Sequence, residues 1–258
     1  MAADGAAVMK LPVAHNPSIH PQITTELQAH LTSKREAVLA MLSAATQEFT
    51  GRIVFANSLG AEDMVLTDII ARAGLGIAIF SLDTGRLPEA TYDLIARTEA
   101  HYAIKIQLYF PQASAVEAYA SQHGINGFYS SMALRKACCA MRKVEPLKRA
   151  LAGQQAWISG VRAQQSITRQ DVAVREFDSA FGLEKFNPLR DWSEREVWAY
   201  IHHYQVPYNA LHEQFYPSIG CAPCTRAVAL GEDIRAGRWW WEDALSKECG
   251  LHSQSATH

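Results

Sequence analysis

Two pairs of cysteines carry the most recognisable chemistry in this sequence. Cys138 and Cys139 are adjacent in "RKACCAMRKVEPL", and Cys221 and Cys224 form a CxxC pair in "GCAPCTRA". A disulfide between adjacent cysteines is strained, whereas four thiolates together are typical ligands of zinc or of an iron–sulfur cluster. Adjacent ligands are awkward around one small ion, so the spacing favours a [4Fe-4S] cluster. Zinc, and thiols without a metal, remain alternatives at this point.

Basic residues surround the adjacent cysteines on a stretch that the pattern predicts to be helical. They are Arg135, Lys136, Arg142 and Lys143. A cluster bound by four thiolates is negatively charged, so these side chains would offset its charge and extend a positive field toward an anionic substrate. The alternative is an ordinary basic helix face in contact with water.

A fifth cysteine, Cys249, stands alone in "KECGLH" near the end of the chain. An odd number of cysteines without a signal peptide argues against a disulfide framework. Reduced thiols and a cytoplasmic location are therefore expected. By position alone, Cys249 is either a free surface thiol or a nucleophile.

The composition is that of a globular protein. Of the 258 residues, 48% are hydrophobic and 19% are charged, and the formal net charge is −2. This charge does not suit a general binder of nucleic acids, and no apolar run is long enough to predict a membrane span.

Strands and helices are expected to alternate along the chain. Hydrophobic patterns predict strands over 52–58, 76–82, 103–110 and 156–162, and short strands over 171–178 and 183–189. Helices are predicted over 23–49, 61–74, 88–102, 113–124, 193–204 and 225–237. This order predicts an α/β fold with a doubly wound, mostly parallel sheet and a C-terminal extension. Residues 1–22 are expected to be a mobile arm.

Ligands of such sheets bind at the carboxyl ends of the strands. There the sequence places Ser58 and Gly60 in "NSLGAED", and Asp83 and Arg86 in "LDTGRLPEA". Arg162 follows the fourth strand in "SGVRAQQSITR". Backbone N–H groups at a helix N-terminus bind oxyanions, so an anionic ligand is expected at this edge.

The motifs together indicate a family. "SLGAEDMVL", "LDTGRLPEA", "CCAMRKVEPL", "SGVRAQQS", "NPLRDWSEREVWAYI", "GCAPCTRAV", "GRWWWE" and "KECGLH" occur in this order. The chain resembles the assimilatory adenylyl-sulfate reductases, in the branch that contains an iron–sulfur cluster. This resemblance covers roughly residues 50–252. It implies the fold of the adenine-nucleotide α-hydrolase group.

The resemblance also implies roles for individual residues. Cys249 would be the nucleophile, on a tail over 237–258 that follows a nucleotide-binding domain over 23–236. One [4Fe-4S] cluster would be bound by Cys138, Cys139, Cys221 and Cys224. Lys143, Arg235 and Arg238 would act on the phosphosulfate, and the nucleotide would lie among Ser58, Gly60, Asp83, Arg86 and Arg162. The family often has Arg and Asp where this chain has Ala163 and Gln164, which puts individual ligands in that loop in doubt.

The implied reaction is the thioredoxin-dependent reduction of adenylyl sulfate to sulfite and AMP, in sulfate assimilation and cysteine biosynthesis. The partners would be the nucleotide, thioredoxin and further copies of the chain, with no nucleic acid and no membrane. The main alternative is a reductase for the 3'-phosphorylated substrate, or for both. A nucleotide pyrophosphatase of the same fold would need an SGGxDS loop, which "SLGAEDM" does not match. An oxygen-sensing binding protein would not need Cys249.

Overall fold

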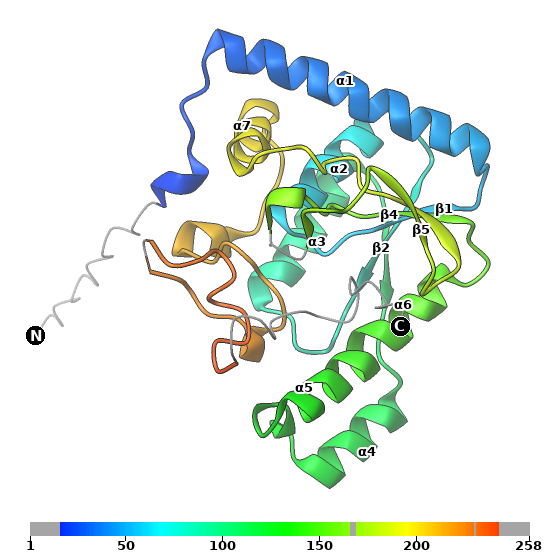
Figure 1. Cartoon of the computed structure of the whole chain (residues 1–258), viewed down its shortest axis with the longest axis vertical. Helices are drawn as coiled ribbons and strands as arrows, with labels where there is room; N and C mark the ends of the chain where they lie inside the picture. Colours follow the sequence, from blue (N-terminus) through cyan, green and yellow to red (C-terminus); the bar gives the residue numbers. More distant parts are fainter. Residues whose placement is uncertain (1–15, 166–168, 230, 243–258) are drawn as a thin grey trace, which may run out of the picture.

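A six-stranded sheet forms the centre of the part of the chain that the computed structural model describes, residues 16–165, 169–229 and 231–242 (Figure 1). The strand order is β3-β2-β1-β4-β6-β5. Neighbouring strands are parallel except for the antiparallel pair β5–β6. The strands are β1 Ile53–Ala56, β2 Ala78–Leu82, β3 Ile106–Tyr109, β4 Ala156–Ile158, β5 Arg175–Asp178 and β6 Leu183–Phe186.

The order of the strands reverses beside β1. The chain adds β2 and β3 on one side of β1 and then returns to add β4 on the other side. Such a reversal leaves a crevice at the carboxyl ends of the two strands, because the chain leaves them in opposite directions. The predicted α/β fold with a mostly parallel sheet is confirmed, and β1 and β4 define its ligand-binding edge.

Helices cover both faces of the sheet. Strand β1 alternates between the faces, since Ile53 and Phe55 belong to one buried cluster and Val54 to the other. The first cluster packs against α1 Thr25–Glu48, α2 Ala61–Arg72, α3 Glu89–Tyr102 and α7 Glu194–Tyr204. The second packs against α6 Glu145–Leu151. Helices α4 Ala113–His123 and α5 Met132–Cys139 form the end of the molecule opposite α1 (Figure 1).

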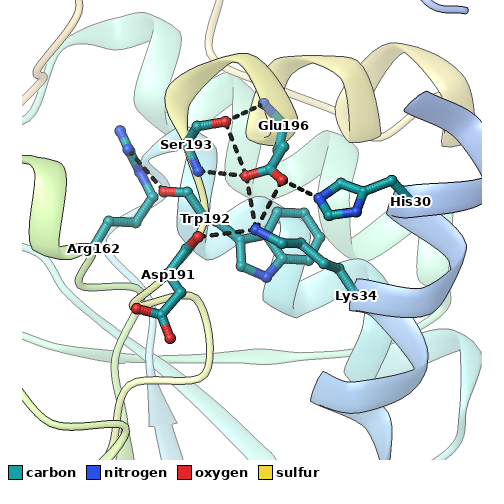
Figure 2. A network of polar contacts seen from close by, with 7 residues as sticks. All are labelled: His30, Lys34, Arg162, Asp191, Trp192, Ser193 and Glu196. Carbon is teal, nitrogen blue, oxygen red and sulfur yellow. Dashed lines mark hydrogen bonds and ion pairs between the residues drawn. The ribbon is translucent and has the colours of Figure 1, made fainter. Parts of the chain in front are cut away.

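Helix α7 begins at the predicted capping box. Ser193 and Glu196 exchange hydrogen bonds with each other's backbone N–H groups. The Glu196 carboxylate also accepts hydrogen bonds from His30 at 2.6 Å and Lys34 at 2.8 Å, both on α1 (Figure 2). Burial alone would raise the pKa of Glu196, but these donors lower it to about 2. One carboxylate therefore joins α1 to the first turn of α7.

Glu196 makes the stability of the fold depend on pH. The pKa of Glu196 in the folded chain lies below its ordinary value of 4.5, so its stabilisation is complete above about pH 5 and disappears as the pH falls toward about 2. We expect Glu196→Gln to lower the free energy of unfolding at pH 7 by about 2 kcal/mol and to flatten this acid dependence. Urea denaturation at a series of pH values measures both effects. Glu36→Gln, at an exposed carboxylate of α1, is the control; an equal effect there would contradict the assignment.

Two parts of the chain differ from the predictions. The predicted helix over 225–237 is wrong for the residues described there, because Thr225 pairs with Arg238 in an antiparallel bridge and Arg226 N–H donates to Gly237 O at 3.0 Å. Residues 16–20, assigned above to the arm, pack on the domain: Ile19 is 2% exposed and its carbonyl oxygen accepts from His202. Residues 1–15 lie outside the described part of the chain.

None of the helices that the structure describes is both long and apolar enough to cross a membrane.

Candidate active site

A cavity of about 270 Å³ opens at the carboxyl ends of β1, β2 and β4. It lies at the crevice that the strand order predicts. Many of the residues singled out from the sequence line it: Ser58, Gly60, Lys143, Arg162, Cys221, Arg235 and Arg238. Segments far apart in the chain therefore meet at one site that is rich in cationic side chains.

The loop between β1 and α2 is held in a tight turn. Asn57 Oδ1 accepts from Leu59 N–H at 2.6 Å, and Leu59 has a left-handed backbone with φ 63°. Few residues other than glycine adopt this conformation, and it is often found at functional sites. The turn brings Ser58 and Gly60 to the cavity at the N-terminus of α2, which begins at Ala61. The positive end of this helix dipole favours an anion there.

Asp63 connects this loop to the residues that follow β4, the neighbour of β1 in the sheet. Its Oδ2 accepts from Ser58 N–H at 2.7 Å and from Ser58 Oγ at 2.5 Å. Burial raises the pKa of Asp63 to about 6, although the bonds from Ser58 act in the opposite direction. Gly160, after β4, is necessary here because a Cβ atom would lie 2.1 Å from Asp63 Oδ1.

Arg162 is buried and has a carboxylate partner. Its Nε donates to Glu62 Oε1 at 2.7 Å, and its Nη1 donates to Trp192 O at 3.2 Å (Figure 2). Burial raises the pKa of Glu62, but the charge and hydrogen bond of Arg162 outweigh it and leave this pKa lowered. Arg162 thus contributes a charge that Glu62 already neutralises in part, so the net positive charge of the cavity depends mainly on other residues.

Lys143 reaches the cavity from a π-helix. Residues Ala140–Val144 form this wider turn between α5 and α6, where the sequence pattern predicts a regular helix. Such turns are frequent at functional sites. The Lys143 charge also acts on Cys224 and lowers the pKa of its thiol, against a larger effect of burial. Lys143 therefore lies between the cysteine region and the cavity.

Arg238 is positioned by a glycine. The guanidinium of Arg238 packs over Gly220, where a Cβ atom would lie 2.4 Å from Nη2. Arg238 is 8% exposed and lies 4.8 Å from the centre of the Trp239 ring. Arg235 lines the same wall of the cavity. These two arginines belong to the C-terminal segment of the described chain, and their action on a phosphosulfate stays a prediction.

The two cysteine pairs meet beside the cavity. Cys221 lies close enough to Cys138 and Cys224 for its charge to raise the pKa of both thiols. Cys138 raises the pKa of Cys224 in the same way. Cys139 is the last residue of α5, next to Cys138. Burial raises the pKa of Cys138, and it raises that of Cys224 to about 11.

This donor set fits an iron–sulfur cluster. Cys138, Cys221 and Cys224 lie near one another, and Cys139 is the neighbour of Cys138 in the chain. A metal centre would take the four soft sulfur ligands as thiolates, in spite of the raised pKa values of Cys138 and Cys224. Among the described residues, no group of three or more His, Cys, Asp or Glu side chains is arranged to hold a single metal ion. A cluster does not need such a group, because each thiolate binds its own iron.

Asp83 and Arg86 do not line the cavity. Asp83 Oδ1 accepts from Gly85 N–H at 2.7 Å and from Tyr92 Oη at 2.9 Å. Arg86 points to the turn after α4, where its guanidinium donates to Asn126 Oδ1 at 3.2 Å. Their loop instead supports the CxxC segment, since Arg86 O accepts from Ala222 N–H at 2.8 Å. Thr84 Oγ1 lies 3.2 Å from Cys221 Sγ.

The C-terminal segment is anchored to the cysteine helix. Glu242 accepts two hydrogen bonds from the buried Arg135, at 2.9 and 2.7 Å. Trp239 N–H donates to Cys224 O at 3.2 Å. The described part of the chain therefore ends, at Glu242, beside the cysteine-bearing helix α5. Cys249 and the predicted tail after residue 242 lie outside the described residues.

Sequence reasoning missed several residues of the cavity wall, among them Glu62, Asp63, Trp198 and His212. Glu62 and Asp63 had a signal, because acidic residues in the first turn after a loop mark a helix start. Nothing near His212 in the sequence indicates a site. Its Nδ1 lies 2.8 Å from Tyr216 O, and burial lowers its pKa to about 4. The ring is therefore neutral at neutral pH.

The sequence matches proteins that are already known. The model of the phosphoadenosine phosphosulfate reductase domain matches residues 52–227. The chain belongs to this family. It is 58% identical over 232 residues to the adenosine 5'-phosphosulfate reductase of Allochromatium vinosum, covering 90% of this chain and 89% of that protein.

Solved structures agree with the fold of the family. The phosphoadenylyl-sulfate reductase of Candida auris, in a phosphate complex, superposes with a TM-score of 0.63 at 27% identity, over 81% of this chain and 99% of that chain. Yeast FAD synthetase superposes with a TM-score of 0.52 at 15% identity, over 82% and 72%. The second likeness concerns the fold alone.

Proposed function

We propose that this protein reduces adenylyl sulfate to sulfite and AMP, with thioredoxin as the reductant. The observation that carries the proposal is the cationic cavity whose wall includes Cys221, with Cys138 and Cys224 close to this cysteine. The sequence similarity of this protein to an adenosine 5'-phosphosulfate reductase, over 90% of the chain, supports the same reaction. Assembly into a homo-oligomer remains a prediction.

The proposed chemistry begins with Cys249. Its thiolate attacks the sulfur of the sulfate group, and the bond from that sulfur to the bridging oxygen breaks with its electron pair leaving on AMP. The product is an S-sulfonated cysteine. A thioredoxin thiolate then attacks Cys249 Sγ and expels sulfite with the electron pair of the S–S bond. The second thioredoxin thiolate resolves the mixed disulfide and restores Cys249. Sulfur gains two electrons and thioredoxin loses two.

The described residues supply the electrostatics of the first step. Negative charge grows on the phosphate as AMP leaves, and Lys143, Arg235 and Arg238 line the cavity where this charge would lie. Ser58 and Gly60 are positioned to place the N-terminus of α2 against the nucleotide phosphate. Asp83 and Arg86 are assigned to the support of the CxxC loop rather than to direct binding.

We assign one [4Fe-4S] cluster to Cys138, Cys139, Cys221 and Cys224. When bound, it would hold the end of α5 and the CxxC loop together and supply a fixed negative charge that orients nearby cations. Electron transfer by the cluster is not required, because the thioredoxin thiols supply both electrons. Arg142 links the two parts of this region. Its guanidinium forms a hydrogen bond with the Cys138 thiol, and its Nη1 donates to Thr84 O at 2.6 Å.

A second candidate is reduction of the 3'-phosphorylated nucleotide. It is favoured by the phosphoadenylyl-sulfate reductase of Candida auris, whose chain is covered almost completely. The two activities differ by one phosphate, so comparing kcat/KM for the two substrates distinguishes them. A preference for the 3'-phosphorylated substrate would replace the first proposal with the second.

The decisive experiment omits the reductant. We expect incubation of the purified protein with adenylyl sulfate to add about 80 Da, the mass of SO3, to Cys249, as measured by intact and peptide mass spectrometry. Thioredoxin should then remove this mass and release sulfite. Cys249→Ser is the control and should stay unmodified. Modification of another cysteine, or sulfite release by Cys249→Ser, would refute the mechanism.

A further inference from the structure

Arg135 is a buried arginine to which the proposed reaction gives no role. It lies on α5 and is 1% exposed. Its Nε and Nη2 donate to the two carboxylate oxygens of Glu242 at 2.9 and 2.7 Å, and its guanidinium also forms a hydrogen bond with the Cys139 thiol. Two parallel hydrogen bonds between an arginine and a carboxylate fix both partners in one geometry. Arg135 is therefore a rigid point on the cysteine-bearing helix.

The same guanidinium holds both ends of a turn in the C-terminal segment. The turn begins at Trp239 and is closed by a hydrogen bond from Glu242 N–H to Trp239 O at 2.9 Å. Arg135 binds the Glu242 carboxylate at one end and lies over the Trp239 ring, 4.6 Å from its centre, at the other. Trp239 has a left-handed backbone with φ 41°, which is unfavourable for a bulky residue and persists only where surrounding contacts impose it. Arg135 supplies two of these contacts.

Arg238, the neighbour of Trp239, has few polar contacts of its own. Within the described part of the chain, its side chain makes one hydrogen bond, from Nη1 to Ser218 Oγ at 3.4 Å, and Nε has no partner. The guanidinium instead packs against Gly220 and lies over the Trp239 ring, 4.8 Å from its centre. The place of Arg238 in the cavity wall therefore depends on where this ring lies.

We propose that Arg135 is a positioning residue for the transfer of the sulfonate group: by holding Trp239 and Glu242, it keeps the Arg238 guanidinium in the wall of the cavity. The inference rests on the proposed function, in which Arg238 stabilises the departing phosphate. Arg135 itself does not line the cavity. It acts through the indole ring that both guanidinium groups contact.

The test is a double-mutant cycle on the rate at which adenylyl sulfate modifies Cys249 in the absence of thioredoxin. Misplacing a group by about 1 Å can slow a reaction about 100-fold, so we expect Arg135→Gln to slow this step about 10-fold to 100-fold. Arg238→Gln should slow it at least as much. If Arg135 acts through Arg238, Arg135→Gln has no further effect once Arg238 is replaced. Losses that multiply in the double variant would show that Arg135 acts independently, and the inference would be wrong.

Arg175 provides the matched control. It also forms a forked pair with a glutamate, Glu48 at 2.8 and 2.7 Å, and lies over an aromatic ring, that of Phe186 at 5.2 Å, but on β5 at the far edge of the sheet. Arg175→Gln should change the rate less than about twofold, because this pair is exposed and distant from the cavity. Should Arg135→Gln fail to fold, the variant that carries both Arg135→Met and Glu242→Met takes its place in the cycle, since removing both partners of a buried pair is often neutral for stability.

A purely structural role gives a different result. Arg135→Gln would then lower the thermal midpoint but leave the rate unchanged when folded proteins are compared at equal iron content. A crystal structure of the variant gives a readout that does not depend on activity: the Arg238 guanidinium should have moved away from Gly220, and an unmoved guanidinium would also refute the inference. If wild-type protein is not modified by adenylyl sulfate, the proposed function itself fails, and this role of Arg135 fails with it. Normal modification of wild-type protein with an unaffected Arg135→Gln variant refutes only the role of Arg135.

Discussion

Replacing Lys143 by Met is expected to lower kcat/KM for sulfite formation by about 100-fold to 1,000-fold, the usual cost of removing one group that stabilises charge in a transition state. Lys143 lines the cavity and its charge reaches Cys224. Its ammonium group is therefore placed to stabilise negative charge on the departing phosphate. Initial rates with adenylyl sulfate and thioredoxin measure the effect. Lys143→Arg should recover part of the activity, since the charge is kept but its geometry changes.

Lys136 is the matched control for this prediction. It has the same charge and lies on α5, which leads directly into the π-helix of Lys143, but it is exposed and does not line the cavity. Lys136→Met should change kcat/KM less than about twofold, because exposed charges are screened by solvent and salt. Equal losses in the two variants would show that the general charge of the helix matters, and that Lys143 has no specific role.

Replacing any one of Cys138, Cys139, Cys221 and Cys224 by Ser is expected to remove both the cluster and the activity. The wild-type protein, prepared without oxygen, should be brown and absorb near about 400 nm. Each Ser variant should lose most of this absorbance, together with its bound iron and acid-labile sulfide. We also expect a lower thermal midpoint, because the cluster would join α5 to the CxxC loop, which lies far from it in the sequence.

Cys249→Ser separates the two roles of sulfur in this prediction. This variant should keep the absorbance and the iron content of the wild-type protein while sulfite formation falls by more than about 1,000-fold. Loss of the absorbance in Cys249→Ser would mean that Cys249 is a ligand. Full activity in an iron-free Cys221→Ser protein would mean that the four thiols have no part in the reaction.

The residues of the site show how far a sequence can lead. The pattern of strands and helices predicted the carboxyl edge of the sheet, and Ser58, Gly60 and Arg162 lie there in the structure. Side-chain direction was less predictable. Arg86 follows β2 as expected but points to Asn126, because that acceptor comes from a turn 40 residues later in the chain.

The predicted helix over 225–237 fails for a related reason. Local propensity favoured a helix, but bonds to other segments outweigh it: Val228 N–H donates to Phe215 O at 2.9 Å, and Thr225 pairs with Arg238. The π-helix at Lys143 likewise has no signature in the local pattern. Such choices depend on which partners the folded chain brings close.

The sequence by itself determined the alternation of strands and helices, the four paired cysteines and the cationic loops, since these depend on residue type and spacing. Only the tertiary structure decided which of these side chains share a cavity, which arginine is paired with Glu62, and that a buried His212 belongs to the cavity wall. The physical reason is that burial and hydrogen bonding depend on partners distant in the chain. A side chain's chemistry is written in the sequence, but its surroundings are set by the fold.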